Sequence, residues 1–165
     1  MTEHSTQIRR AASCNCGKLQ IVCEGEPVRT GICHCLECQR RTGSVFSSQA
    51  FFKRDQIAST TGDVTEYTRQ AVSGRSVTFR FCPTCGSTVY WEAEGFPGHV
   101  AVAVGSFADP SFGPPKYSVW ERRRHEWVAP SATWRSTIRP GPSSNCRAPP
   151  KVRPTKARHA AIKLS

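Results

Sequence analysis

The chain has 165 residues, 38% of them hydrophobic, and a formal net charge of +11. This length and apolar content suit one globular domain with a modest core. The sequence has no apolar run of about 18 residues and no apolar stretch near its start, which argues against a membrane span and a signal peptide. We therefore expect a cytoplasmic protein.

The positive charge is concentrated at the C-terminal end. Residues 1–128 contain 15 basic and 12 acidic residues, whereas residues 129–165 contain 8 basic residues and no acidic one. A nearly balanced first part gives little electrostatic reason to propose DNA or RNA as its ligand. We expect no binding of nucleic acid except through the basic tail.

The chain divides into a flexible N-terminus at residues 1–12, a domain at 13–128 and a tail at 129–165. Short stretches rich in β-branched and aromatic residues predict strands in the domain, at 18–24, 44–52, 76–82, 87–93 and 99–107. The one helix considered is a short one at 53–59. The sequence therefore predicts a mainly β domain.

The tail is dense in Pro, Ser and Arg and has scarcely any apolar run. Such a segment cannot bury enough surface to offset the entropy lost on ordering, so we expect residues 129–165 to be disordered. An accessory arm that binds anions or nucleic acid is the alternative.

The chain contains 9 cysteines, an odd number in closely spaced groups. Without an export signal, this pattern favours metal ligation over a disulfide scaffold. The group Cys82-Pro-Thr-Cys85 is typical of a zinc knuckle, a tight turn that presents two sulfur atoms to one metal. Cys14 and Cys16 supply the other half of a closed, four-thiolate structural site.

A third group places three thiols within "CHCLEC", at Cys33, Cys35 and Cys38. Three protein ligands and one open position are the arrangement of catalytic zinc sites. Alternatively, His34, Cys23 or a neighbouring side chain completes a second structural site. We expect His34 to face solvent or to form a hydrogen bond, and Cys23 to be a small buried hydrophobe. Cys146 lies in the tail.

The segments "CNCGK", "CHCLECQRRTGS" and "FRFCPTCGSTVYW", followed by "AVAVGSFADPSFGPPKYSVWERRRHEWV", resemble the glutathione-dependent formaldehyde-activating enzyme family, whose relatives include centromere protein V. The resemblance spans residues 13–128. It implies a β-tent fold of several curled antiparallel sheets. It also implies two zinc ions per chain, a structural one at Cys14, Cys16, Cys82 and Cys85 and a catalytic one at Cys33, Cys35 and Cys38.

The resemblance further implies a carbon–sulfur lyase-type activity on the adduct of a thiol and an aldehyde, such as S-hydroxymethylglutathione formed from glutathione and formaldehyde. Arg40 and Arg41 follow the third ligand directly and could fork onto the carboxylates of such a thiol. The alternative is a non-enzymatic zinc-binding module for protein or nucleic acid. An open metal position facing a cleft would distinguish the enzyme from the module.

Other residues have more ordinary interpretations. We expect core or pocket-wall positions for Trp91, Trp120 and Trp127, and turn chemistry for Asp109 before Pro110.

The chain has Ser118 where family members often have histidine, and it lacks their acidic, aromatic ending. One hypothesis is that a one-nucleotide shift in the codons of residues 132–134 would restore such an ending with Gly-Asp-Val.

Overall fold

The computed structural model describes residues 8–71, 73–129 and 135–137. A three-stranded antiparallel sheet has the order β1-β2-β5, with β1 at Arg9–Ser13, β2 at Gln20–Glu24 and β5 at Ile57–Thr61. An eight-stranded sheet has the order β11-β10-β3-β4-β9-β8-β7-β6. Its strands are β3 (Arg29–Cys33), β4 (Ser47–Lys53), β6 (Thr65–Gln70), β7 (Ser76–Phe81), β8 (Thr88–Ala93), β9 (His99–Ala103), β10 (Tyr117–Val119) and β11 (Arg135–Thr137).

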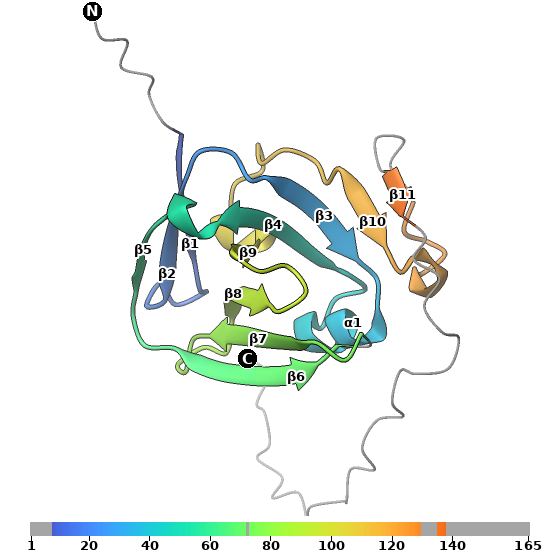
Figure 1. Cartoon of the computed structure of the whole chain (residues 1–165), viewed down its shortest axis with the longest axis horizontal. Coiled ribbons are helices and arrows are strands. Elements are labelled where there is room, and N and C mark those ends of the chain that lie inside the picture. Colours follow the sequence, from blue (N-terminus) through green and yellow to red (C-terminus); the bar gives the residue numbers. More distant parts are fainter. Residues whose placement is uncertain (1–7, 72, 130–134, 138–165) are drawn as a thin grey trace, which may run out of the picture.

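The prediction of a mainly β domain is confirmed. The larger sheet curls so that β3 and β4 lie opposite β6 and β7, with α1 (Leu36–Thr42) at one end of the molecule (Figure 1). Three short 3-10 helices complete the described structure: η1 (Arg54–Gln56), η2 (Val104–Phe107) and η3 (Glu121–Arg123). None of the helices in the described ranges is long and apolar enough to cross a membrane.

Two predictions for the first part of the chain differ from the structure. The flexible N-terminus predicted at 1–12 is wrong for its last residues, because β1 pairs with β2 and buries Ala12 completely. The helix predicted at 53–59 is a single 3-10 turn, η1, followed by β5, whose β-branched residues favour pairing with β2.

The tail contributes one strand to the described structure. Residues 135–137 form β11, which pairs in parallel with β10, so the prediction of disorder is wrong for these three positions. Strand addition uses main-chain hydrogen bonds and requires little apolar burial, which is why composition did not reveal it. Residues 130–134 and 138–165 of the predicted disordered tail lie outside the described residues, and so do Cys146 and the codon hypothesis for 132–134.

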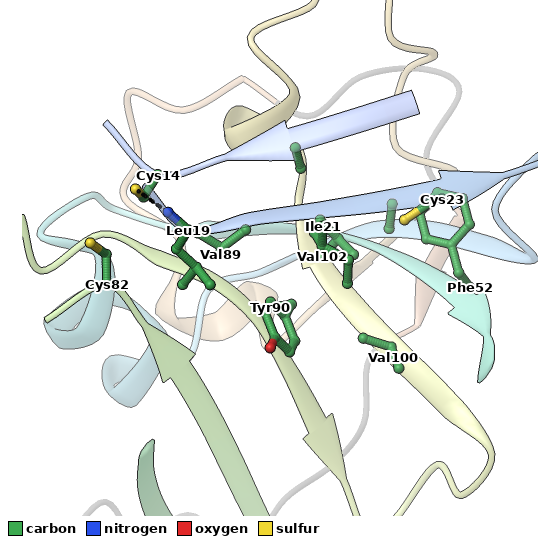
Figure 2. Packing of buried hydrophobic residues seen from close by; sticks show 12 residues of the cluster. Cys14, Leu19, Ile21, Cys23, Phe52, Cys82, Val89, Tyr90, Val100 and Val102 are labelled. Atoms are coloured by element: carbon green, nitrogen blue, oxygen red, sulfur yellow. Dashed lines mark hydrogen bonds between the residues drawn. The ribbon is translucent and has the colours of Figure 1, made fainter. Parts of the chain in front are cut away.

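The main core lies between the two sheets. Leu19, Ile21 and Cys23 from the β2 region meet Val100 and Val102 of β9, and all five side chains are buried (Figure 2). Cys23 has no exposed surface, which confirms its prediction as a buried hydrophobe. This core joins the small sheet to one face of the large one.

The opposite face of the large sheet carries a second apolar cluster. Strand register pairs Phe51 with Ala101, Ala101 with Trp91, and Trp91 with Phe79. Directly paired residues point to the same face of a sheet, so these side chains form one row across four strands. The small sheet does not cover this row, and its three aromatic members, Phe51, Trp91 and Phe79, line the pocket described next.

Candidate metal centres and pocket

Two turns bring four cysteines together at one end of the main core. Cys14 and Cys16 follow β1, and Cys82 and Cys85 follow β7. Their sulfur atoms all lie within 4.8 Å of one another, with 3.5 Å between Cys14 and Cys16 and 3.6 Å between Cys16 and Cys82. The structure therefore brings together the four residues predicted for the closed site.

The backbone of both turns is suited to this clustering. The amide N–H of Leu19 donates to Sγ of Cys14 at 3.2 Å, drawn as a dashed line in Figure 2. Gly17 and Gly86 close the two turns with φ of 75° and 74°, a region that side chains other than glycine rarely adopt. Each glycine N–H donates at 2.9 Å to the carbonyl of the first cysteine of its turn, Cys14 or Cys82.

The second cluster depends on helix α1. Cys33 ends β3, Cys35 is the N-cap of α1, and Cys38 lies in its first turn, where its N–H donates to Sγ of Cys35 at 3.4 Å. The three sulfur atoms lie within 4.8 Å of one another. The sequence analysis identified these cysteines but not the helix, whose first turn directs two of the thiols to one point.

Because these three thiols lie in close contact, their pKa values differ. Hydrogen bonds from Cys33 and Cys38 lower the pKa of Cys35 to about 2, because they stabilise its thiolate. Hydrogen bonds to Cys35 and Cys38, together with burial, raise the pKa of Cys33. A thiolate supported by two neighbouring thiols is a suitable starting point for a thiophilic metal, since metal binding displaces the remaining protons.

Both clusters fit zinc by the chemistry of their donors. Thiolate sulfur is a preferred zinc ligand, and all eight cysteines in the described ranges are free. Within those ranges, no histidine, carboxylate or further cysteine joins either group. Cys23 lies in the main core, so it is not part of the three-thiol cluster.

His34 does not join the three-thiol cluster either. Of its two predicted roles, the solvent-facing one is wrong, because its side chain has no exposed surface and its ring meets Phe46 edge-on at 5.8 Å between centroids. Strand alternation explains this result, since His34 follows the pocket-facing Cys33 and points to the other side. Its backbone N–H donates to the carbonyl of Val119 at 3.0 Å, which continues the pairing of β3 with β10.

The three thiols line a pocket of about 340 Å³ on the face of the large sheet that carries the second apolar cluster. Phe79 and Trp91 form part of its wall, with Tyr117 and Trp120. Three arginines also line it, at Arg29, Arg41 and Arg69, together with Gln49 and Glu37. The pocket thus combines sulfur donors, aromatic walls and positive charge.

The structure separates the two arginines predicted to bind substrate. Arg41 lines the pocket, donates to Oγ of Ser47 at 2.6 Å, and places its guanidinium 4.6 Å from the ring centroid of Trp91. Arg40 does not line the pocket and pairs with Glu37 at 2.7 Å, with 45% of its side chain exposed. Of these two arginines, only Arg41 is therefore positioned to meet a molecule in the pocket.

Sequence reasoning missed Arg29, Arg69 and Tyr117 as pocket residues. Arg29 lies four residues before Cys33 on β3, so the two share a face of the sheet. This signal was present in the sequence, but β3 itself was not predicted. Arg69 reaches the pocket only because the sheet curls until β6 faces the thiol cluster, which no local pattern reveals.

The predictions for Trp91, Trp120 and Asp109 agree with the structure, and the one for Trp127 does not. Trp91 and Trp120 line the pocket as predicted, whereas the prediction for Trp127 is wrong, because 73% of it is exposed. Asp109 makes the expected turn, accepting hydrogen bonds from N and Oγ of Ser111. Ser118 is buried on the sheet face away from the pocket, since its neighbours Tyr117 and Val119 face the pocket.

The fold and the site define a mainly β domain with two cysteine clusters that could hold metal ions. The chain belongs to the glutathione-dependent formaldehyde-activating enzyme family, whose model matches residues 9–123. Comparison with curated proteins gives no match. Among solved structures, the chain is similar to a Rhodobacter sphaeroides protein, with 21% identity, a TM-score of 0.47 and coverage of 63% of this chain and 91% of that one.

Proposed function

We propose that the protein catalyses the reversible addition of a thiol, such as glutathione, to an aldehyde, such as formaldehyde. The thiol sulfur bonds to the carbonyl carbon, the carbon–oxygen π bond breaks, and the thiol proton ends on the oxygen. With glutathione and formaldehyde, the product is S-hydroxymethylglutathione. In the reverse direction, the same step is a carbon–sulfur lyase reaction.

The observation that carries this proposal is the position of Cys33, Cys35 and Cys38 on the wall of a pocket large enough for a small molecule. A purely structural metal site has no need of such a space beside it, since its ligands only have to close around the ion. Membership of the family supports the choice of glutathione and formaldehyde as reactants.

Zinc is the metal we propose for both clusters. Held by three thiolates, it would supply a Lewis acid and favour the ionised form of an incoming thiol. The four-thiol cluster would have a structural role, because it joins the turn after β1 to the turn after β7. The chain's own groups have separate tasks beside the three-thiol cluster.

Arg41 provides positive charge next to the reacting sulfur. Its side chain is fixed by Ser47 and by the rings of Phe79 and Trp91, at 4.9 and 4.6 Å from the ring centroids. A fixed cation needs little reorganisation as negative charge develops during the reaction. The aromatic side chains that line the pocket lower the local polarity, which strengthens the interaction of Arg41 with developing negative charge.

The experiment is to measure the initial rate of formaldehyde consumption by zinc-loaded protein as the glutathione concentration is varied. The proposal predicts a rate that increases with protein concentration and requires the thiol. Cys35→Ser should lose this activity. A rate equal to the spontaneous reaction would instead favour the non-enzymatic zinc-binding module.

A further inference from the structure

The three pocket arginines have no carboxylate partner in the described structure. The only acidic residue lining the pocket is Glu37, which is paired with Arg40. Each ion pair found among the described residues involves Arg10, Arg40, Arg54 or Arg80, none of which lines this pocket. The pocket therefore keeps an excess of positive charge that a bound anion could neutralise.

Two of these arginines are held by aromatic rings rather than by hydrogen bonds to side chains. The guanidinium carbon of Arg29 lies 3.9 Å from the ring centroid of Tyr117, and that of Arg69 lies 5.5 Å from the ring centroid of Phe79. Contact with a ring orients a guanidinium but does not use its N–H groups, which lie in its own plane. Arg29 thus keeps the fork that binds a carboxylate with two hydrogen bonds. Arg69 donates from Nη1 to the carbonyl of Gln70 at 3.2 Å, and its Nε and Nη2 remain for a carboxylate.

Arg29 and Arg69 come from different parts of the large sheet. Arg29 begins β3, the strand that ends at Cys33, and Arg69 lies on the edge strand β6. Figure 1 shows β3 and β6 on opposite sides of the curled sheet. The two guanidinium groups are therefore suited to two separate anionic groups on one ligand, whereas Arg41 is held by Ser47 beside the thiols.

We propose that Arg29 and Arg69 are specificity-determining residues that together bind two separate carboxylates of a thiol substrate while its sulfur meets Cys33, Cys35 and Cys38. The substrate class is a thiol that carries two carboxylates, and small neutral thiols are poor substrates. This inference rests on the proposed function. It assigns to Arg29 and Arg69 the role that the sequence suggested for Arg40 and Arg41.

The test separates binding from reaction by using S-methylglutathione, which keeps both carboxylates but has no thiol to react. Calorimetry should show that the parent protein binds it about a hundredfold more tightly than its dimethyl ester, about tenfold for each carboxylate. Arg29→Gln and Arg69→Gln should each weaken binding of the diacid about tenfold and leave binding of the diester unchanged. The double variant should bind the diacid and the diester equally.

Arg9→Gln is the matched control, because Arg9 is an exposed residue of β1 in the other sheet and the change removes the same charge. It should bind S-methylglutathione as the parent does. Circular dichroism and metal analysis would establish that each variant is folded and loaded. Unchanged diacid binding by Arg29→Gln and Arg69→Gln, or equal losses for diacid and diester, would overturn the inference.

This test gives a different answer from the activity test. If the parent accelerates formaldehyde consumption but the arginine variants bind the diacid normally, the proposed function stands. The assignment of Arg29 and Arg69 as carboxylate-binding residues is then wrong. If the diacid binds in a charge-dependent way without any acceleration, the anion site stands and the proposed reaction is wrong.

Discussion

The ring of Tyr117 lies against Gly31, its direct partner on the neighbouring strand β3. A Cβ atom added to Gly31 would fall 2.2 Å from Cζ of this ring, closer than any real contact. The guanidinium carbon of Arg29 also lies over this ring, at 3.9 Å from its centroid. The absence of a side chain at position 31 therefore allows Tyr117 to support Arg29.

Gly31→Ala should displace the Tyr117 ring and reduce stability by about 1–3 kcal/mol, the usual cost of overpacking a buried site. Binding of S-methylglutathione should also weaken, because Arg29 loses its support. Gly113→Ala is the control, since a Cβ there meets no atom within 4 Å. Urea unfolding and calorimetry measure the two effects, and a Gly31→Ala protein as stable as the control would contradict this account.

The four-thiol cluster should hold the two sheets together through its metal. In Cys82→Ser, a hydroxyl replaces a thiolate and binds zinc poorly. Because structural zinc contributes on the order of 10 kcal/mol to the folding of small domains, we expect this variant to lose one metal ion and most of its folded protein. Metal analysis and circular dichroism are the measurements. Folded Cys82→Ser protein with its full metal content would remove the structural role.

Cys23→Ser is the matched control for that experiment. Cys23 is buried in the main core and belongs to neither cluster. A buried hydroxyl should cost about 1–3 kcal/mol of stability without changing the metal content. A loss of metal in this control would mean that Cys→Ser changes act through general destabilisation.

The three-thiol cluster should behave differently from the four-thiol one. In Cys35→Ser, bound zinc should fall from about two ions per chain to about one, while the protein stays folded, because the four-thiol site is intact. Mass spectrometry under native conditions measures both the metal count and the folded charge distribution. Retention of two zinc ions would show that Cys35 is not needed to hold the metal.

Ending the chain at Ala129 should leave the fold and both metals intact, since the removed part of the described structure is only the three-residue strand β11. β10 would then become the edge of the large sheet. Its amide hydrogens that face β11 should exchange faster, because edge groups are open to water. Hydrogen exchange measured by mass spectrometry tests this, and a large loss of thermal stability would show that the tail contributes more than one strand.

Local sequence signals predicted the elements that carry strong β-branched patterns, such as β7 and β9. They did not predict β3, because its sequence "RTGIC" has a glycine at its centre, and glycine is uncommon in strands. The reason for this glycine is the ring of Tyr117, which packs against it from another strand. The sequence did not predict α1 either. Its seven residues, "LECQRRT", include none that is buried, so the sequence shows no apolar face with helical periodicity. The helix mainly places Cys35 and Cys38.

The cysteines of the site were recognisable in the sequence because their close spacing is typical of metal-binding motifs. The arginines were not, because an arginine that follows these cysteines in sequence need not line the pocket. Arg40 turns to Glu37 within α1, whereas Arg69 comes from a distant strand. Tertiary curvature of the large sheet decides which charges reach the thiols, and no local sequence pattern contains that information.

The most direct test of the account is exchange spectroscopy of carbon-13 formaldehyde and glutathione at equilibrium, with and without the protein. We predict that the zinc-loaded protein accelerates interconversion of formaldehyde hydrate and S-hydroxymethylglutathione in proportion to its concentration. Cys23→Ser should retain this acceleration and Cys35→Ser should lose it. An exchange rate that stays at the spontaneous value at every protein concentration would contradict the proposed function.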